Sequence, residues 1–360
     1  MPERMPVPRI AAGSCDSYDI GFLKEFFSRA FKEIGFAAHQ STVLLKPNLL
    51  AGRAPRKAVN THPHIVRSLA EMLLDEGCTL LVGDSPGYES TERALKGSGI
   101  GEVVKALGLQ VARFDKKVIK RSRGVSPYRE FLLGEDPEGF DLIINLPKFK
   151  THAMMGLTLG VKNTFGFVPR FEKAKWHLKA GRDALLFAAI LLDIYTIVKP
   201  SLTILDGIVA MEGDGPSGGR PRHAGLLAVS DDALALDLFV EKILALPDML
   251  PVSRVARDKG LTRDAEIVDL GLPAIRDFLM PATMDTGFNL PGAVRNALKN
   301  VISKRPKCDQ SLCKQCGVCA EVCPAGALTM DEEYPAFDYK QCIRCYCCQE
   351  MCPSSAILLR

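Results

Sequence analysis

Apolar residues recur along the chain with two periods, one typical of helices and one of buried strands. At 19–35 they fall at helical spacing, which predicts an amphipathic helix packed on a core. Further helical patterns occur at 61–76, 99–107, 183–198 and 231–246. Short apolar runs typical of strands occur at 42–45, 79–82, 110–114, 141–146, 201–205 and 226–230. This alternation predicts an α/β fold, with a mostly parallel sheet and flanking helices.

Polar residues gather where the predicted strands end. Lys46 and Asn48 follow the first strand, and Asp84, Ser85 and Gly87 follow the second. Ligands of open parallel sheets bind outside the carboxyl ends of the strands, so these residues are candidates for binding a cofactor. An ordinary tight turn at Gly83–Gly87 is an equally good interpretation. Neither the dinucleotide fingerprint nor Walker A occurs in the sequence.

The stretch 145–177 is the candidate active centre, because it follows the apolar strand 141–146 and is rich in basic residues. Lysines supply charge for a carboxylate or phosphate, and histidines move protons or ligate metals. Glycines in the stretch let backbone amides approach a ligand. The candidate catalytic residues are His152, Lys162 and His177, and the candidate binding residues are Lys148, Lys150 and Asn163. A basic surface loop is the alternative.

A second glycine-rich loop, 211–219, follows the predicted strand 201–205. Gly213 and Gly215 are further candidates for cofactor binding. Asp206, Glu212 and Asp214 are interpreted either as partners of a metal or a substrate amine, or as solvated acids of a turn. The segment 247–302 contains several prolines and is expected to form short helices that cover the sheet.

Two cysteine runs with the same spacing lie 29 residues apart near the end of the chain. Each reads Cys-x2-Cys-x2-Cys-x3-Cys-Pro, which is typical of bacterial ferredoxins, where the fourth cysteine ligates the other cluster. The pattern predicts two [4Fe–4S] clusters, one on Cys313, Cys316, Cys319 and Cys352 and one on Cys342, Cys345, Cys348 and Cys323. Cys308 and Cys347 lie outside the spacing and are interpreted as bystander thiols. Disulfides and zinc fit the pattern poorly.

The length of 360 residues allows an α/β domain at 1–303 and a small α+β ferredoxin-like domain at 304–360. Residues 1–19 lack the apolar core of a signal peptide. The longest apolar run, 184–198, is interrupted by Asp193 and is too short to span a bilayer. We therefore expect a cytoplasmic protein without a membrane span.

The net charge of +4 is unevenly distributed. Between 148 and 183 there are eight Lys or Arg residues and two acidic ones. Such a basic field indicates a small anionic ligand or an acidic partner protein. No nucleic-acid-binding motif accompanies it, so we expect no nucleic-acid partner.

The chain resembles a group of bacterial and archaeal iron–sulfur proteins that carry domain of unknown function 362 (DUF362). The resemblance rests on VLLKPNLL, NTHP, VGDSPG, IINLPKFKTHAMMGLTLGVKNTFG, ILDGIVAMEGDGPSGG and the two cysteine runs, in that order. It implies an α/β domain coupled to a two-cluster ferredoxin, and hence a redox role. The family has no general assigned activity.

A fainter resemblance is to lactate racemase-type proteins, in which a lysine tethers a nickel-pincer nucleotide and a later histidine binds nickel. Lys162 and His177, fifteen residues apart, are similar to that arrangement. The residues around them match poorly.

Together these patterns predict an oxidoreductase in which two clusters pass electrons to an anionic substrate or cofactor in the α/β domain. One alternative is a non-catalytic electron-transfer protein that serves a donor or acceptor partner. Another is a lactate-racemase-like enzyme with a metal cofactor. An additional, unidentified cofactor, flavin or nickel among others, stays open at this point.

Overall fold

The computed structural model describes residues 6–246, 250–284 and 304–360. A sheet of ten strands forms its centre, with the principal order β12-β1-β11-β10-β7-β2-β3-β4. Most neighbouring pairs are parallel, while β11 runs antiparallel to both β1 and β10. The strands are β1 (Arg9–Ser14), β2 (Thr42–Pro47), β3 (Thr79–Val82), β4 (Gln110–Val111), β7 (Leu142–Leu146), β8 (Lys148–His152), β9 (Gly156–Thr158), β10 (Leu202–Glu212), β11 (Arg220–Ser230) and β12 (Glu266–Asp269).

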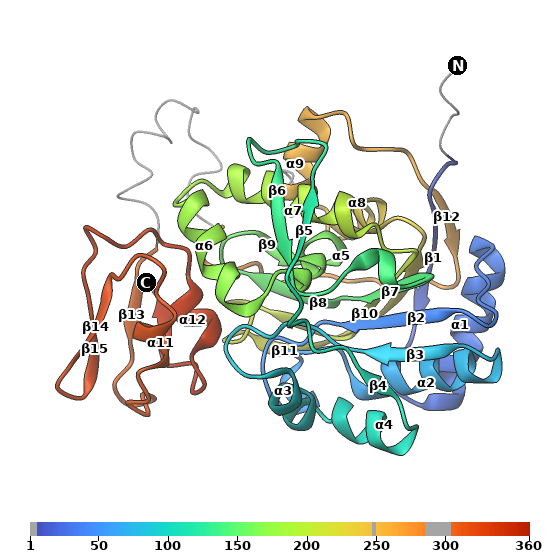
Figure 1. Cartoon of the computed structure of the whole chain (residues 1–360), viewed down its shortest axis with the longest axis horizontal. Coiled ribbons are helices and arrows are strands. Elements are labelled where there is room, and N and C mark those ends of the chain that lie inside the picture. The colour runs from blue at the N-terminus through green and yellow to red at the C-terminus, as the bar shows by residue number, and fades with distance from the viewer. Residues whose placement is uncertain (1–5, 247–249, 285–303) are drawn as a thin grey trace.

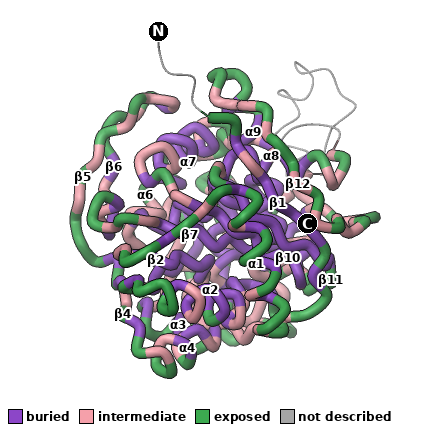
Figure 2. Tube along the Cα trace, turned by 90° about the vertical axis from the view of Figure 1, so that its right-hand side faces the viewer, coloured by how far each residue is buried: buried purple, intermediate pink, exposed green. Residues whose placement is uncertain are grey.

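Helices cover both faces of the sheet (Figure 1), so the predicted α/β class is confirmed. One layer holds α1 (Ile20–Ile34), α2 (Pro63–Asp75), α3 (Thr91–Ser98) and α4 (Ile100–Ala106). The other holds α5 (Gly160–Asn163), α6 (Arg170–Ala180), α7 (Ala184–Val198), α8 (Ala233–Ile243) and α9 (Pro251–Asp258). The central strands between the layers are buried along most of their length (Figure 2).

Local signals explain where several helices begin and end. The Asp19 side chain accepts a hydrogen bond from the backbone N–H of Phe22 at the start of α1, and Gly35 ends that helix at φ 73°. Asp183 caps α7 in the same way, through the backbone N–H groups of Leu185 and Leu186. These two helices therefore begin and end close to the positions predicted from the apolar pattern.

The structure corrects several expected elements. β1 was not predicted, although it pairs with β11 inside the sheet. No strand was predicted at 148–152, which is the buried strand β8; its lysines and histidine interrupt the apolar pattern typical of a strand. The hairpin of β5 (Val118–Arg121) and β6 (Glu130–Leu133) was not predicted either. The expected helices at 247–302 lie partly outside the described residues; α9 and β12 lie within them.

The C-terminal segment forms two small antiparallel sheets and two short helices. β13 (Pro306–Cys308) pairs with β16 (Ile357–Leu359), and β14 (Leu328–Asp331) pairs with β15 (Tyr334–Phe337). The helices are α11 (Val318–Glu321) and α12 (Cys347–Met351). This segment packs beside α6 (Figure 1). The Gln349 side-chain amide donates to the Asp214 carbonyl at 2.6 Å, and Arg182 donates to the Cys342 carbonyl at 2.7 Å.

Within the described parts of the chain, no helix is both long and apolar enough to span a membrane. The charge that interrupts the apolar run of α7 has a structural partner. Asp193 is fully buried, and its carboxylate accepts hydrogen bonds from the backbone N–H groups of Val125 at 2.7 Å and Ser126 at 2.8 Å, and from the Ser122 hydroxyl. Asp193 thereby fixes the loop between β5 and β6 to the core.

Replacing Asp193 with Ala should destabilise the protein, because the half-buried backbone N–H of Val125 and the buried one of Ser126 lose their acceptor. Each such loss costs about 1–3 kcal/mol, so we expect a decrease of roughly 2–5 kcal/mol in the free energy of unfolding. Urea unfolding under anaerobic conditions measures it. Asp193→Asn keeps one oxygen acceptor and should lose less. Equal stability of Asp193→Ala and wild type would contradict this role.

Candidate functional site

A cavity of about 180 Å³ lies between the α/β domain and the C-terminal segment. It opens where β2 and β3 end and is bounded by α5 and α6 on one side and by α11 and α12 on the other. Most of the predicted site residues converge on its wall: Asn48, Asp84, Ser85, Gly87, Lys150, His152, Lys162, Asn163 and His177. The C-terminal segment contributes Glu321, Val322, Cys347, Glu350 and Met351.

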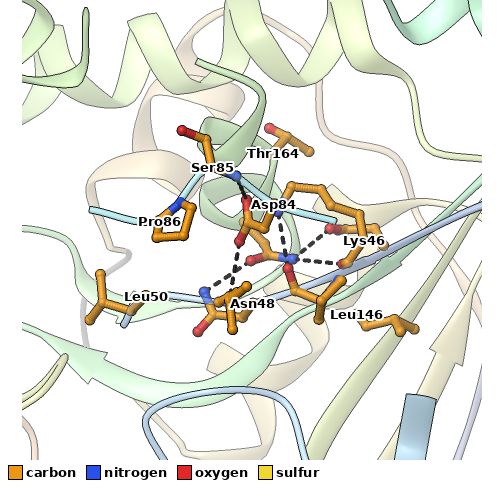
Figure 3. A network of polar contacts seen from close by, with 12 residues as sticks. Lys46, Asn48, Leu50, Asp84, Ser85, Pro86, Leu146 and Thr164 are labelled. Atoms are coloured by element: carbon orange, nitrogen blue, oxygen red, sulfur yellow. Dashed lines mark hydrogen bonds and ion pairs between the residues drawn. The ribbon is translucent and has the colours of Figure 1, made fainter. Parts of the chain in front are cut away.

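Lys46 and Asp84 form a buried ion pair beneath this wall, with Lys46 Nζ 3.0 Å from Asp84 Oδ1. The same carboxylate accepts hydrogen bonds from the backbone N–H groups of Leu49 at 2.9 Å and Ser85 at 2.8 Å (Figure 3). A Cβ atom at Gly166 would lie 1.9 Å from Asp84 Oδ1, so only glycine leaves room for the pair. Lys46 is thus occupied by Asp84 and fixes the loops after β2 and β3.

A chain of side-chain amides links these loops to α5. Asn145 donates to the Gly160 carbonyl at 3.0 Å, Asn163 donates to Asn145 Oδ1 at 2.8 Å, and Asn48 donates to Asn163 Oδ1 at 3.0 Å. Because a carbonyl can only accept, it fixes the orientation of every amide in the chain. Asn48 Oδ1 remains buried without a hydrogen-bond partner among the described residues.

The carboxylate of Asp237 anchors the start of α5. Its two oxygens accept from the backbone N–H groups of Gly160 at 2.7 Å and Val161 at 3.0 Å. Burial raises the pKa of Asp237 above its ordinary value. This anchor places Lys162 and Asn163, the next residues of the helix, at the cavity.

One face of α6 is directed at the cavity. Arg170, Lys173, Ala174 and His177 all line it, at the spacing of one helical face. Lys173 donates to the Ser85 and Pro86 carbonyls. Burial is the main cause that lowers the pKa of Lys173 to about 7.

Two lysines from other elements add positive charge. Lys150 of β8 is buried and donates to the Val59 carbonyl at 2.8 Å, and burial with the nearby Lys162 lowers its pKa to about 7. Among the described residues Lys162 has no carboxylate or carbonyl partner, and its Nζ lies over Phe165 and Phe187, at 5.4 Å and 6.0 Å from the ring centroids. Lys162 is therefore the cation most available to a ligand.

The two histidines differ in their surroundings. His152 Nδ1 accepts from the backbone N–H groups of Met154 at 3.1 Å and Met155 at 3.2 Å, so the proton lies on Nε2. Nε2 lies 2.6 Å from Glu350 Oε1. His177 contacts the rings of Phe165 and Phe187, and its Nδ1 has no hydrogen-bond partner in the described part of the chain. Burial lowers the pKa of His177 to about 3, which keeps the ring neutral.

Other predicted residues lie away from the cavity. Lys148 Nζ lies 2.8 Å from Asp206 Oδ2 and donates to the Tyr18 hydroxyl at 2.9 Å, and Gly213 ends β10 at φ 76°. Gly215 contacts Thr151 behind the wall, while its neighbour Pro216 lines it. Gly87, in contrast, lines the cavity, and a Cβ atom there would lie 2.3 Å from Met351 Sδ, so this glycine leaves room for α12.

Sequence reasoning missed Arg170, Lys173 and Glu350. The first two carry a signal, because with His177 they repeat at helical spacing. Glu350 carries none, since it lies inside the cysteine run and reaches the cavity only through the packing of the two parts of the chain.

The four cysteines predicted to hold the first cluster lie together: Cys313, Cys316, Cys319 and Cys352 line one small cavity of the C-terminal segment. The grouping of Cys342, Cys345, Cys348 and Cys323 stays a prediction from the spacing. In the described residues no three His, Cys, Asp or Glu side chains converge on one metal ion. A [4Fe–4S] cluster instead binds four separate thiolates, which suits both groups.

The cavity at the domain junction lies beside the second cysteine group. Cys347, interpreted from the sequence as a bystander, is buried in its wall next to Cys348. Val322, adjacent to Cys323, lines the same wall. The basic cavity is therefore separated from one predicted cluster by very few residues.

The fold and the cysteine groups define an iron–sulfur protein with an α/β domain and a ferredoxin-like module. Residues 43–240 match the model of the domain of unknown function DUF362, and residues 312–356 match that of a 4Fe-4S dicluster domain. The chain is 34% identical over 295 residues to a thylakoid-associated protein of Synechocystis sp., covering 79% of this chain and 91% of the relative. The chain belongs to the DUF362 family.

Two solved structures are more distant. A structural-genomics protein of Thermotoga maritima gives a TM-score of 0.36 at 15% identity, covering 58% of this chain and 55% of that one. The lactate racemase apoprotein of Thermoanaerobacterium thermosaccharolyticum gives 0.37 at 12% identity, covering 61% and 53%. The chain thus spans little more than half of either protein. Scores of this size imply nothing about activity.

Adjacent cysteines provide a matched test of the ligand assignment. Replacing Cys348 with Ala should reduce the iron content of anaerobically purified protein from about eight to about four or fewer per chain, because a ligand is lost. Cys347→Ala should keep the full content. Iron and acid-labile sulfide analysis measures both. Equal iron loss in the two variants would contradict the assignment.

Proposed function

We propose that this protein is an oxidoreductase that transfers electrons between the ferredoxin-like module and a small anionic substrate bound at the domain junction. The observation that carries the proposal is the cavity itself, whose wall combines the basic residues of the α/β domain with residues next to the predicted cluster ligands. The clusters, when bound, supply or accept single electrons.

The lysines would bind the anionic group. Lys150, Lys162 and Lys173 line the cavity, and among the described residues none of them has a carboxylate of the α/β domain as an ion-pair partner. The carboxylate of Asp84 is occupied by Lys46. Positive charge therefore exceeds negative charge on this side of the cavity, which favours an anion.

The apolar residues of the wall and the volume of the cavity limit the polarity and the size of the rest of the ligand. Leu49, Leu50, Phe165, Phe171 and Met351 line the cavity and would exclude water from the body of the ligand. A cavity of about 150 Å³ holds benzene, so the enclosed space suits an acid with a body about the size of one ring.

The histidines would have separate tasks. His152 accepts a hydrogen bond from the backbone and contacts Glu350, so its task would be to hold Glu350 in position at the cavity wall. The neutral ring of His177 has an unpartnered Nδ1 and would hydrogen-bond to the ligand and hold a proton at a ring nitrogen.

Two alternatives from the sequence persist. A non-catalytic electron carrier would need its clusters and a docking partner but no ligand in the cavity. A racemase-like enzyme would need Lys162 and His177 together, and both do line the cavity. A simple anion-binding site would also use Lys162 and His177 together, so their shared position at the cavity does not favour the racemase-like alternative.

Lysine substitutions test the anion site. Lys162→Met should weaken the binding of benzoate or sulfate by about tenfold or more, because a charge-assisted contact contributes about 1.5–3 kcal/mol. Lys179→Met is the matched control, since Lys179 also lies over aromatic rings, 4.2 Å from the Trp176 centroid, but outside the cavity. Calorimetry on the holoprotein measures both. Absence of anion binding in wild type would favour the carrier.

Anion affinity should fall as pH rises through about 7. Lys150 and Lys173, each with a pKa lowered to about 7, are protonated below that value and neutral above it. The charged groups facing them are Lys46, Asp84, Lys148, Lys162 and Glu350. We expect benzoate to bind roughly tenfold more weakly at about pH 9 than at about pH 6. Lys173→Arg, which stays charged, should flatten the profile. A flat wild-type profile would contradict the assignment.

A further inference from the structure

In the described part of the chain, Glu350 is a buried carboxylate that the ferredoxin-like module contributes to the basic wall of the cavity. It lies on α12, two residues after Cys348 and two before Cys352, the predicted ligands of different clusters. Its side chain is 8% exposed, whereas that of its contact His152 is 1% exposed. A carboxylate in such a place is costly unless positive charge compensates it.

The basic groups around this carboxylate belong to the α/β domain. His152 Nε2 lies 2.6 Å from Glu350 Oε1. Lys162 and His177 line the same cavity wall as Glu350, and Lys162 is the cation among these groups. Among the described residues, Lys162 Nζ and His177 Nδ1 have no hydrogen-bond partner, so these two atoms can bind a ligand.

Backbone contacts hold α12 in this position independently of the carboxylate. The Ser217 hydroxyl donates to the Glu350 carbonyl at 2.8 Å, and Gln349 donates to the Asp214 carbonyl at 2.6 Å. Removing the charge of Glu350 should therefore leave these hydrogen bonds between the two modules intact.

We propose that Glu350 is an internal counter-anion of the ligand site, which shares Lys162 and His177 with an incoming anionic ligand and so limits the negative charge that the cavity accepts. This inference rests on the proposed function, because it assumes that the cavity binds an anion. Glu350 is a specificity-determining residue: it lines the cavity together with the groups that would hold the ligand, and its carboxylate lies against His152.

The position of Glu350 also links the ligand to the clusters. Like charges placed together in a site of low polarity repel each other strongly. Negative charge near an iron–sulfur cluster also favours its oxidised form. Bound anion and Glu350 together should therefore make the clusters stronger reductants when the substrate is present.

The test compares Glu350→Gln with wild type in anaerobically prepared holoprotein of equal iron content. Calorimetry with benzoate and with sulfate measures anion affinity, and a potentiometric titration measures the reduction potential. Glu333→Gln is the matched control, because Glu333 belongs to the same module and accepts from the Gln315 side-chain amide at 2.9 Å, but is exposed and lies outside the cavity. Glu350→Asp keeps the charge on a shorter side chain.

We expect Glu350→Gln to bind both anions at least about tenfold more tightly than wild type and to show a less negative cluster potential. Glu333→Gln and Glu350→Asp should resemble wild type. Unchanged or weaker binding in Glu350→Gln, while wild type still binds, would overturn the counter-anion role and leave the proposed function intact. Failure of every variant and of wild type to bind either anion would overturn both.

Discussion

The structure depends on how positive charge is compensated at one edge of a buried sheet. Lys46 near the end of β2 and Lys148 and Lys150 in β8 are each almost fully buried, and burying a charge without a partner is costly. Asp84 and Asp206 pair with the first two. Among the described residues, Lys150 has a backbone carbonyl as its partner and no ion pair. Positive charge therefore remains at the cavity.

That residual charge explains why the two parts of the chain function together. The ferredoxin-like module closes the cavity with α11 and α12, and its Glu350 supplies negative charge that the α/β domain lacks. The same helix lies between predicted ligands of both clusters. A single surface thus joins the two parts, encloses a small volume and brings the basic residues close to the cluster ligands, as an enzyme that moves electrons to a bound anion requires.

The sequence predicted the parts of the structure that depend on local patterns. The spacing of the cysteines is local, and so are the apolar strands that place Asn48 and Asp84 at the sheet edge. β8 was missed because its buried lysines have partners distant in sequence, so it does not look apolar. For the same reason Lys148 and Lys150, two residues apart, could not be told apart, although only Lys150 reaches the cavity.

The most direct measurement of the central claim is the reoxidation of reduced clusters by small acids released from the protein itself. Holoprotein is purified without oxygen, its released small molecules are identified by mass spectrometry, and each is returned to chemically reduced protein while cluster absorbance is followed. We expect a small acid to reoxidise the clusters of wild type, and a Lys162→Met variant with full iron content to respond far more slowly. Equal reoxidation rates in the two proteins, or clusters that no released acid oxidises, would contradict the account.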